Sequence, residues 1–93
     1  MIRSFKCKDT EGIWEGRLSR KFPGAIQDRA SRKLRQLDAA RTTDDLRNPP
    51  GNRLEALKGK LAGFHSIRIN DQWRVVFRWT DSGPAEVDIR DYH

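Results

Sequence analysis

The fold of this chain is decided by residues 65–79, which read HSIRINDQWRVVFRW. Two runs within it, His65–Asn70 and Trp73–Trp79, alternate between apolar and polar side chains, as half-buried β-strands do. Only Asp71 and Gln72 separate the runs, and two residues are a typical length for the loop of a tight hairpin. The stretch therefore predicts two antiparallel strands joined by a short turn.

A third strand is predicted directly after this hairpin. Residues Asp81–Pro84 read DSGP, a turn sequence, and alternation resumes from Ala85. Before the hairpin, the segment Arg53–Lys58 alternates weakly and is interpreted as a short strand or an extended arm, and Gly59–Gly63 forms a glycine-bounded turn. The second half of the chain is thus predicted to form a sheet of neighbouring strands.

A long helix is predicted from about Ala25 to Ala40. Its apolar residues recur at spacings of three and four and form one buried stripe: Ile26, Ala30, Leu34, Leu37 and Ala40. The opposite side is a basic ridge, formed by Arg29, Arg32, Lys33 and Arg35. Such a ridge is most simply a solvent-exposed face.

The N-terminal part is predicted to hold one strand and a first helix. Met1–Lys8 is interpreted as the strand, and Asp9 or Thr10 can cap a helix that ends before the break at Phe22–Gly24. The apolar side of this helix would consist of Ile13, Trp14 and Leu18. The predicted class is α+β: an N-terminal strand and two helices packed on one face of a mostly antiparallel sheet. A length of 93 residues suits a single domain over residues 1–93.

Composition narrows the partners and the compartment. The formal net charge of +6 favours a polyanion such as nucleic acid, although a basic surface also serves solubility or an acidic protein partner. Cys7 is the only cysteine, which excludes an internal disulfide and suits a reducing compartment. No apolar run is long enough to span a membrane, and the N-terminus lacks a signal-peptide core. We expect a cytoplasmic protein without a membrane partner.

The three predicted strands place an unusual set of side chains on one face. Alternation puts four arginines together there, with Asn70, Val76, Asp88 and Tyr92: Arg68, Arg74, Arg78 and Arg90. An ordinary solvent face mixes charge signs, because like charges opposite each other on neighbouring strands are destabilising. Arginine is well suited to bind phosphate and to stack on bases. Arg68, Asn70, Arg78 and Arg90 are therefore candidate RNA-binding residues.

The C-terminal Asp91-Tyr92-His93 has two interpretations. The carboxylate, phenol and imidazole form a proton-handling site, or they are a frayed polar tail. Lys58, before Gly59, is similarly either functional or an exposed lysine. His65, a lone histidine beside a turn, is expected to be exposed and passive. One Cys and two His far apart lack metal-ligand spacing, so no metal or other cofactor is expected.

Several of these segments together resemble the HigB toxins of bacterial toxin–antitoxin pairs, and most closely the GraT-like branch. The resemblance spans essentially the whole chain, and the segments that carry it are Met1–Phe5, Pro49–Gly59, Asn70–Arg74 and Asp91–His93. HigB toxins belong to the RelE/ParE superfamily of small α+β proteins. The order and spacing of Leu-Lys-Gly, Trp-Arg and Asp-Tyr-His make the combination fairly specific.

The resemblance implies a metal-independent endoribonuclease that cuts mRNA on the translating ribosome and so inhibits translation. It also implies a cognate helix-turn-helix antitoxin (HigA-like) through which alone the pair would contact operator DNA. Carried onto this chain, the catalytic group is Asp91, Tyr92, His93, Arg74 and Lys58. Better-studied HigB proteins have a histidine where this chain has Glu55, so Glu55 is a further candidate for acid–base work.

Two other functions remain open at this stage. One is a non-nuclease toxin of the same fold, like the gyrase-poisoning ParE branch, which acts by protein contact. The other is a non-catalytic RNA- or ribosome-binding protein, which would explain the basic charge without chemistry. The arginine face and the terminal Tyr92-His93 favour the nuclease.

Overall fold

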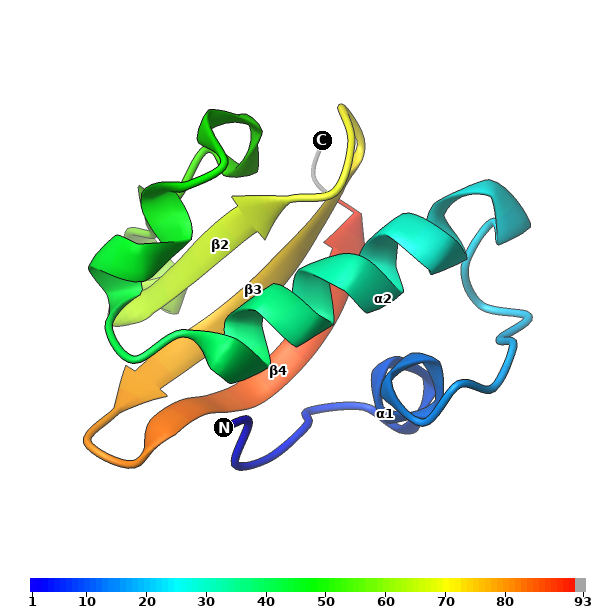
Figure 1. Ribbon diagram of the computed structural model, residues 1–93, viewed down its shortest axis with the longest axis horizontal. Helices are drawn as coiled ribbons and strands as arrows, with labels where there is room; N and C mark the ends of the chain where they lie inside the picture. The colour runs from blue at the N-terminus through cyan, green and yellow to red at the C-terminus, as the bar shows by residue number, and fades with distance from the viewer. Residues whose placement is uncertain (92–93) are drawn as a thin grey trace.

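The structure is a computed structural model, and it describes residues 1–91. A four-stranded antiparallel sheet in the order β1-β2-β3-β4 consists of Glu55–Ala56, Phe64–Arg68, Trp73–Thr80 and Gly83–Asp91 (Figure 1). The helices are α1 (Lys8–Trp14) and α2 (Gly24–Ala39), and three 3₁₀ turns follow: η1 (Thr43–Arg47), η2 (Pro50–Asn52) and η3 (Gly59–Leu61). The predicted α+β class with a mostly antiparallel sheet is confirmed.

The helix α2 crosses one face of the sheet and buries the predicted stripe (Figure 1). Its Leu34 and Leu37 are fully buried against a sheet core that comprises Ile67, Ile69, Val75, Phe77, Val87 and Ile89. Ala40, the last predicted stripe residue, lies just after the helix and is only partly buried. We call the sheet face that packs on α2 the inner face and the opposite face the outer face.

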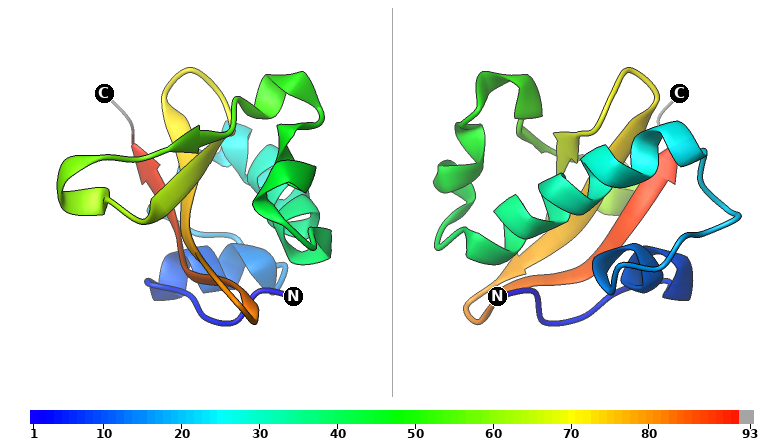
Figure 2. Two further views of the ribbon diagram at one scale, coloured as in Figure 1. Left: turned by 90° about the vertical axis from the view of Figure 1, so that its left-hand side faces the viewer. Right: turned by 45° about the vertical axis from the view of Figure 1, so that its right-hand side comes forward.

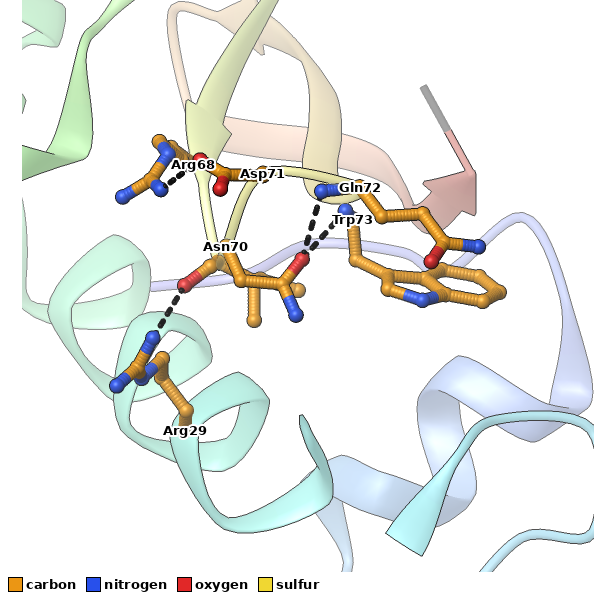
Figure 3. Close-up of polar contacts among 7 residues, drawn as sticks. Arg29, Arg68, Asn70, Asp71, Gln72 and Trp73 are labelled. Atoms are coloured by element: carbon orange, nitrogen blue, oxygen red, sulfur yellow. Dashed lines mark hydrogen bonds and ion pairs between the residues drawn. The ribbon is translucent and has the colours of Figure 1, made fainter. Parts of the chain in front are cut away.

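The predicted hairpin forms with a turn that is one residue longer than expected. Arg68 pairs with Arg74, and the Ile69 amide donates to the Trp73 carbonyl at 2.9 Å, which leaves Asn70–Gln72 as the turn. The side-chain oxygen of Asn70 accepts hydrogen bonds from the amides of Gln72 (2.9 Å) and Trp73 (2.8 Å) (Figure 3). This Asx-type turn satisfies two backbone donors, which explains the extra residue.

The expected N-terminal strand is reduced to one parallel bridge, between Phe5 and Val87. The amide of Lys6 donates to the Val87 carbonyl at 2.9 Å, and the Val87 amide donates to the Ser4 carbonyl at 3.0 Å. Figures 1 and 2 show this segment running beside β4. It covers the edge of β4 without joining the sheet as a regular strand.

The helix α1 begins and ends earlier than the sequence suggested. Its N-cap is Cys7, whose sulfur accepts from the Thr10 amide at 3.4 Å, rather than Asp9 or Thr10. The helix stops at Trp14, two residues before Gly16, which has a φ of +85°, a left-handed conformation that commonly terminates helices. Leu18 therefore lies outside the helix and is 90% exposed, so its predicted place on the apolar side is wrong.

The strand β4 begins at Gly83 and contains a β-bulge. Val76 pairs with Asp88 and Arg78 with Ala85, so β3 advances two residues while β4 advances three. Glu86 lies in this bulge with a φ of +52°. The uninterrupted alternation expected from Ala85 is thus shifted at Glu86.

Among residues 1–91, no helix is both long enough and apolar enough to cross a membrane.

Candidate nucleic-acid interface

Three arginines stand in one row across the outer face. Arg74 on β3 is the direct partner of Arg68 on β2 and of Arg90 on β4. Directly opposed residues of antiparallel strands lie on the same face with Cβ atoms about 5 Å apart. The structure therefore brings together these three of the four predicted arginines, and we call them the arginine row.

Arg74 is the most tightly held member of the row. Its Nε donates to the Ser66 hydroxyl at 2.8 Å, and its Nη2 donates to the Arg53 carbonyl at 2.6 Å. The Glu55 carboxylate lies 3.9 Å from Nη2, and only 11% of the Arg74 side chain is exposed. A planar guanidinium bound at two points has a fixed orientation, which a lysine ammonium in its place would lack.

The loop that supplies Arg53 and Glu55 is anchored through Asn52, which is 0% exposed. Its Nδ2 lies within hydrogen-bonding distance of the Gln36 side-chain oxygen (3.1 Å) and the Leu46 carbonyl (3.2 Å), and its Oδ1 accepts from Lys33. Arg53, the next residue, is left-handed with a φ of +45°. This anchoring aims the Arg53 carbonyl and the short strand β1 at Arg74.

Glu55 lies on the same face as the row, whereas Lys58 does not contact Arg74. Glu55 pairs with Ser66, which is one of the side chains that bind Arg74. Lys58 lies beyond β1, directly before η3, and its exposed ammonium forms no hydrogen bond or ion pair within residues 1–91. Of the two candidates on this segment, the structure brings only Glu55 to the arginine row.

Arg68 is partly buried at the β2 end of the row. It forms an ion pair with Asp71, the exposed middle residue of the β2–β3 turn (Figure 3). The hydrogen bond from Arg68, together with its charge, lowers the pKa of the Asp71 carboxyl. Arg68 keeps 29% of its side chain exposed, and Arg90 is exposed. Both can reach a ligand from solvent.

The other two predicted RNA-binding residues have local partners. The Nε of Arg78 donates to the Glu86 carboxylate at 2.7 Å, at the bulged end of the outer face. Asn70 uses its side-chain oxygen to hold the β2–β3 turn. Neither contact tests RNA binding, but each gives the residue a structural role that its sequence position did not indicate.

The C-terminal group is described only at its first residue. Asp91 pairs with Trp73, so strand register places it on the face opposite to Arg90, and its carboxylate accepts from Gln72 at 3.0 Å. Tyr92 and His93 lie outside the described residues. Their predicted catalytic roles stay predictions.

Two residues near the row carry roles that sequence reasoning missed. Ser66 lies on the arginine face, where it is fully buried and accepts from Arg74, a role that its place in the strand did not indicate. His65 was expected to be exposed, but its ring stacks on Phe77 at 6.0 Å and its Nδ1 is buried without a partner in the described chain. Within residues 1–91, no cluster of three or more His, Cys, Asp or Glu could hold a metal ion.

Comparison with known proteins identifies the family. The model of a family described as the RelE-like toxin of type II toxin–antitoxin system HigB matches residues 3–93. The chain belongs to the HigB family. Toxin HigB-1 of Vibrio cholerae is 46% identical over 82 residues, which cover 87% of this chain and 86% of that protein. Endoribonuclease HigB of Proteus vulgaris is 30% identical over 93 residues, the full length of both chains.

A solved structure extends this HigB similarity to the fold. A chain in the YoeB–YefM complex from Staphylococcus aureus superposes with a TM-score of 0.63 and covers 100% of this chain and 98% of its own length. At 17% sequence identity, this match concerns the fold alone. The HigB assignment and the RelE-like sheet agree with the resemblance inferred from Pro49–Gly59 and Asn70–Arg74.

Proposed function

We propose that this HigB-family toxin is an mRNA endonuclease that cuts messages on the translating ribosome and thereby inhibits translation. The arginine row is the observation that carries the proposal, because three guanidinium groups on one sheet face form a surface suited to RNA phosphates. The full-length similarity to a protein named Endoribonuclease HigB supports the same activity.

In the proposed reaction, the 2′-hydroxyl of the RNA attacks its own 3′-phosphate and the 5′-oxygen leaves. This forms a 2′,3′-cyclic phosphate on one product and a 5′-hydroxyl on the other. Arg74 is held in place before the substrate arrives, so it stabilises the charge that builds on the phosphoryl oxygens without reorganising. Lys58 is proposed to add a second positive charge.

The proton transfers are assigned to the remaining candidates. Glu55, beside Arg74, is proposed to take the 2′-hydroxyl proton, and His93 is proposed to protonate the leaving 5′-oxygen. Tyr92 would stack on a base or orient the sugar, and Asp91 completes the terminal group. We propose no metal or other cofactor, since these groups supply the acid, the base and the positive charge.

The proposed partners follow from the family. A cognate helix-turn-helix antitoxin (HigA-like) would bind the toxin, and operator DNA would be reached only through that antitoxin. The bacterial ribosome and its mRNA are the proposed targets. The protein is proposed to act in the cytoplasm as a single domain spanning residues 1–93, without a membrane partner.

Primer extension on an mRNA translated by purified ribosomes tests the activity. We expect discrete cleavages with the wild-type protein and none with His93→Ala, while both proteins still bind ribosomes. Intact mRNA with the wild-type protein would overturn the nuclease. Inhibition of gyrase supercoiling would then point to a ParE-like toxin, and retained RNA binding alone would point to a non-catalytic binding protein.

A further inference from the structure

A basic cleft lies where α2 meets η2 and the end of β2. It has a volume of about 270 Å³. The residues that line it are Arg29, Arg32, Lys33, Gln36, Gly51, Arg68 and Ile69. Four of these are cations, and none is acidic or aromatic.

Two of the four cations bind only neutral groups within residues 1–91. Arg29 donates to the Ile69 carbonyl at 3.3 Å, and Lys33 donates to the Asn52 side-chain oxygen. By contrast, Arg32 forms an ion pair with Asp28, and Arg68 forms one with Asp71. Figure 3 shows the guanidinium groups of Arg29 and Arg68 on the same side of the β2–β3 turn. The positive charge in the cleft is therefore only partly neutralised.

The neighbouring positive charges affect the protonation of Lys33. Burial lowers the pKa of its ammonium, and the charges of Arg29 and Arg68 lower it further. A bound anion would favour the charged lysine and relieve the repulsion between the three cations. The cleft thus has the electrostatic properties of an anion site in which no carboxylate of the described residues, 1–91, pairs with Arg29 or Lys33.

The chemistry of the walls selects the kind of anion. Within residues 1–91, no aromatic ring lines the cleft, so these residues offer a nucleobase no stacking surface. Its volume falls just below the roughly 300–1,000 Å³ that is typical of pockets for whole small molecules. Guanidinium and ammonium donors fit the compact, multiply accepting phosphate group.

We propose that this cleft is a second RNA site, which binds a backbone phosphate next to the arginine row. Arg68 belongs to both places, since it pairs with Arg74 in the sheet and also lines the cleft. A strand that lies over Arg74 therefore continues past Arg68 to Arg29 and Lys33. This inference rests on the proposed function, because it requires RNA on the arginine row.

Salt-dependent binding of a short single-stranded RNA with blocked 2′-hydroxyls tests the cleft. Loss of one phosphate contact lowers the slope of log affinity against log salt by about 0.7 for a single strand. We expect this decrease, with weaker binding, in Arg29→Gln. The matched control is Arg35→Gln, which removes the same charge from an exposed position of α2 outside the cleft. Equal slopes for the two variants would overturn the proposal.

A conservative variant separates phosphate binding from support of the turn. Arg29→Lys keeps the charge but changes the donor that reaches the Ile69 carbonyl. We expect it to restore most of the salt slope, whereas a purely structural role would leave the slope unchanged in all variants and lower only the melting temperature. That second pattern would contradict the cleft.

Two further measurements, RNA binding by Arg90→Gln and binding of a polyglutamate peptide, show which proposal has failed. If Arg90→Gln weakens RNA binding while Arg29→Gln behaves like Arg35→Gln, the cleft is wrong and the arginine row stands. If none of the three variants changes RNA binding, RNA recognition by the row is wrong as well. If Arg29→Gln loses only the binding of a polyglutamate peptide, the cleft serves an acidic protein and the phosphate proposal is overturned.

Discussion

The arginines at the two ends of the outer sheet face have different neighbours on the adjacent strands. At one end, Arg68, Arg74 and Arg90 oppose each other directly across three strands. At the other end, Arg78 has a carboxylate beside it, because Glu86 accepts from its Nε at 2.7 Å. Opposed like charges cost a few tenths to about 1 kcal/mol of stability per pair. The three arginines of the row therefore destabilise the sheet, whereas Arg78 has an acidic neighbour.

The β-bulge accounts for the difference. It lies between the pairs Val76–Asp88 and Arg78–Ala85, and the left-handed Glu86 within it carries the carboxylate that meets Arg78. The row end is regular, with one arginine per strand and no acid in the row itself. The bulge thus places a carboxylate on the strand next to Arg78, whereas the carboxylates beside the row come from elsewhere: Asp71 in the β2–β3 turn forms an ion pair with Arg68, and Glu55 on β1 lies 3.9 Å from Arg74.

Replacing Arg74 is expected to have the largest effect. Arg74→Gln should lower the rate of mRNA cleavage by about 10²–10³-fold, the usual cost of removing one preorganised transition-state donor. Arg74→Lys should restore little, because a flexible ammonium does not hold the bonds to Ser66 and the Arg53 carbonyl in the fixed geometry of the planar guanidinium. Primer extension with purified ribosomes gives the rates.

The matched change at the bulged end is Arg78→Gln, which removes the same charge from the same strand. We expect it to reduce cleavage less than about tenfold, because a pair exposed to solvent contributes little. An equal loss in both variants would erase the distinction between the two ends.

Removing the anchor of the row end should mainly affect stability. Asn52→Ala takes a fully buried amide from Lys33, Gln36 and the Leu46 carbonyl, and leaves those groups without their partner. We expect a loss of about 2–4 kcal/mol in the free energy of unfolding, measured by urea denaturation. The exposed Asn48→Ala should change it by less than about 0.5 kcal/mol. Equal values would show that the loop needs no anchor.

Removing one arginine from the row should stabilise the protein and weaken its binding to RNA. Arg90→Gln removes one like-charge pair with Arg74, so the free energy of unfolding should rise by about 0.2–1 kcal/mol. RNA affinity should fall, with a salt slope lower by about 0.7. Calorimetry and fluorescence anisotropy measure the two quantities. If the Arg90→Gln protein is less stable than the wild type and binds RNA with the same affinity, Arg90 neither repels Arg74 nor contacts a phosphate.

The smallest effect is expected from making the bulged end resemble the row. Glu86→Gln leaves Arg78 without its carboxylate, so RNA affinity at low salt should rise a few-fold and the rise should vanish as salt screens the charge. The cleavage rate should stay unchanged. A faster cleavage reaction would mean that the bulged end contributes to catalysis.

Local periodicity predicted the parts of the fold that depend on neighbouring residues. The stripe on α2 and the alternation of β2 and β3 each repeat every few residues, so Leu34, Leu37, Ile67 and Val75 were placed correctly. The common face of Arg68, Arg74 and Arg90 followed from the same alternation. These predictions needed no contact between distant segments.

The features that were missed depend on single side chains or on distant partners. Asn70 lengthens the turn by binding two backbone amides, and Cys7 caps α1 although sulfur is a weak acceptor. The Asn52 anchor joins α2, η1 and η2, and the basic cleft needs α2 beside β2. The helical pattern of the basic ridge does not distinguish Arg29 and Lys33, which line the cleft, from Arg35, which lies outside it.

The close approach of Met1 to Gly83 has a consequence for self-association. A Cβ atom at Gly83 would lie 2.6 Å from the Met1 carbonyl oxygen, so this contact requires glycine. From there the first residues run along β4 and occupy hydrogen-bonding groups that another chain could otherwise use. The opposite edge, β1, is only two residues long. The sheet therefore offers neither edge as a long template, which protects it against edge-to-edge aggregation.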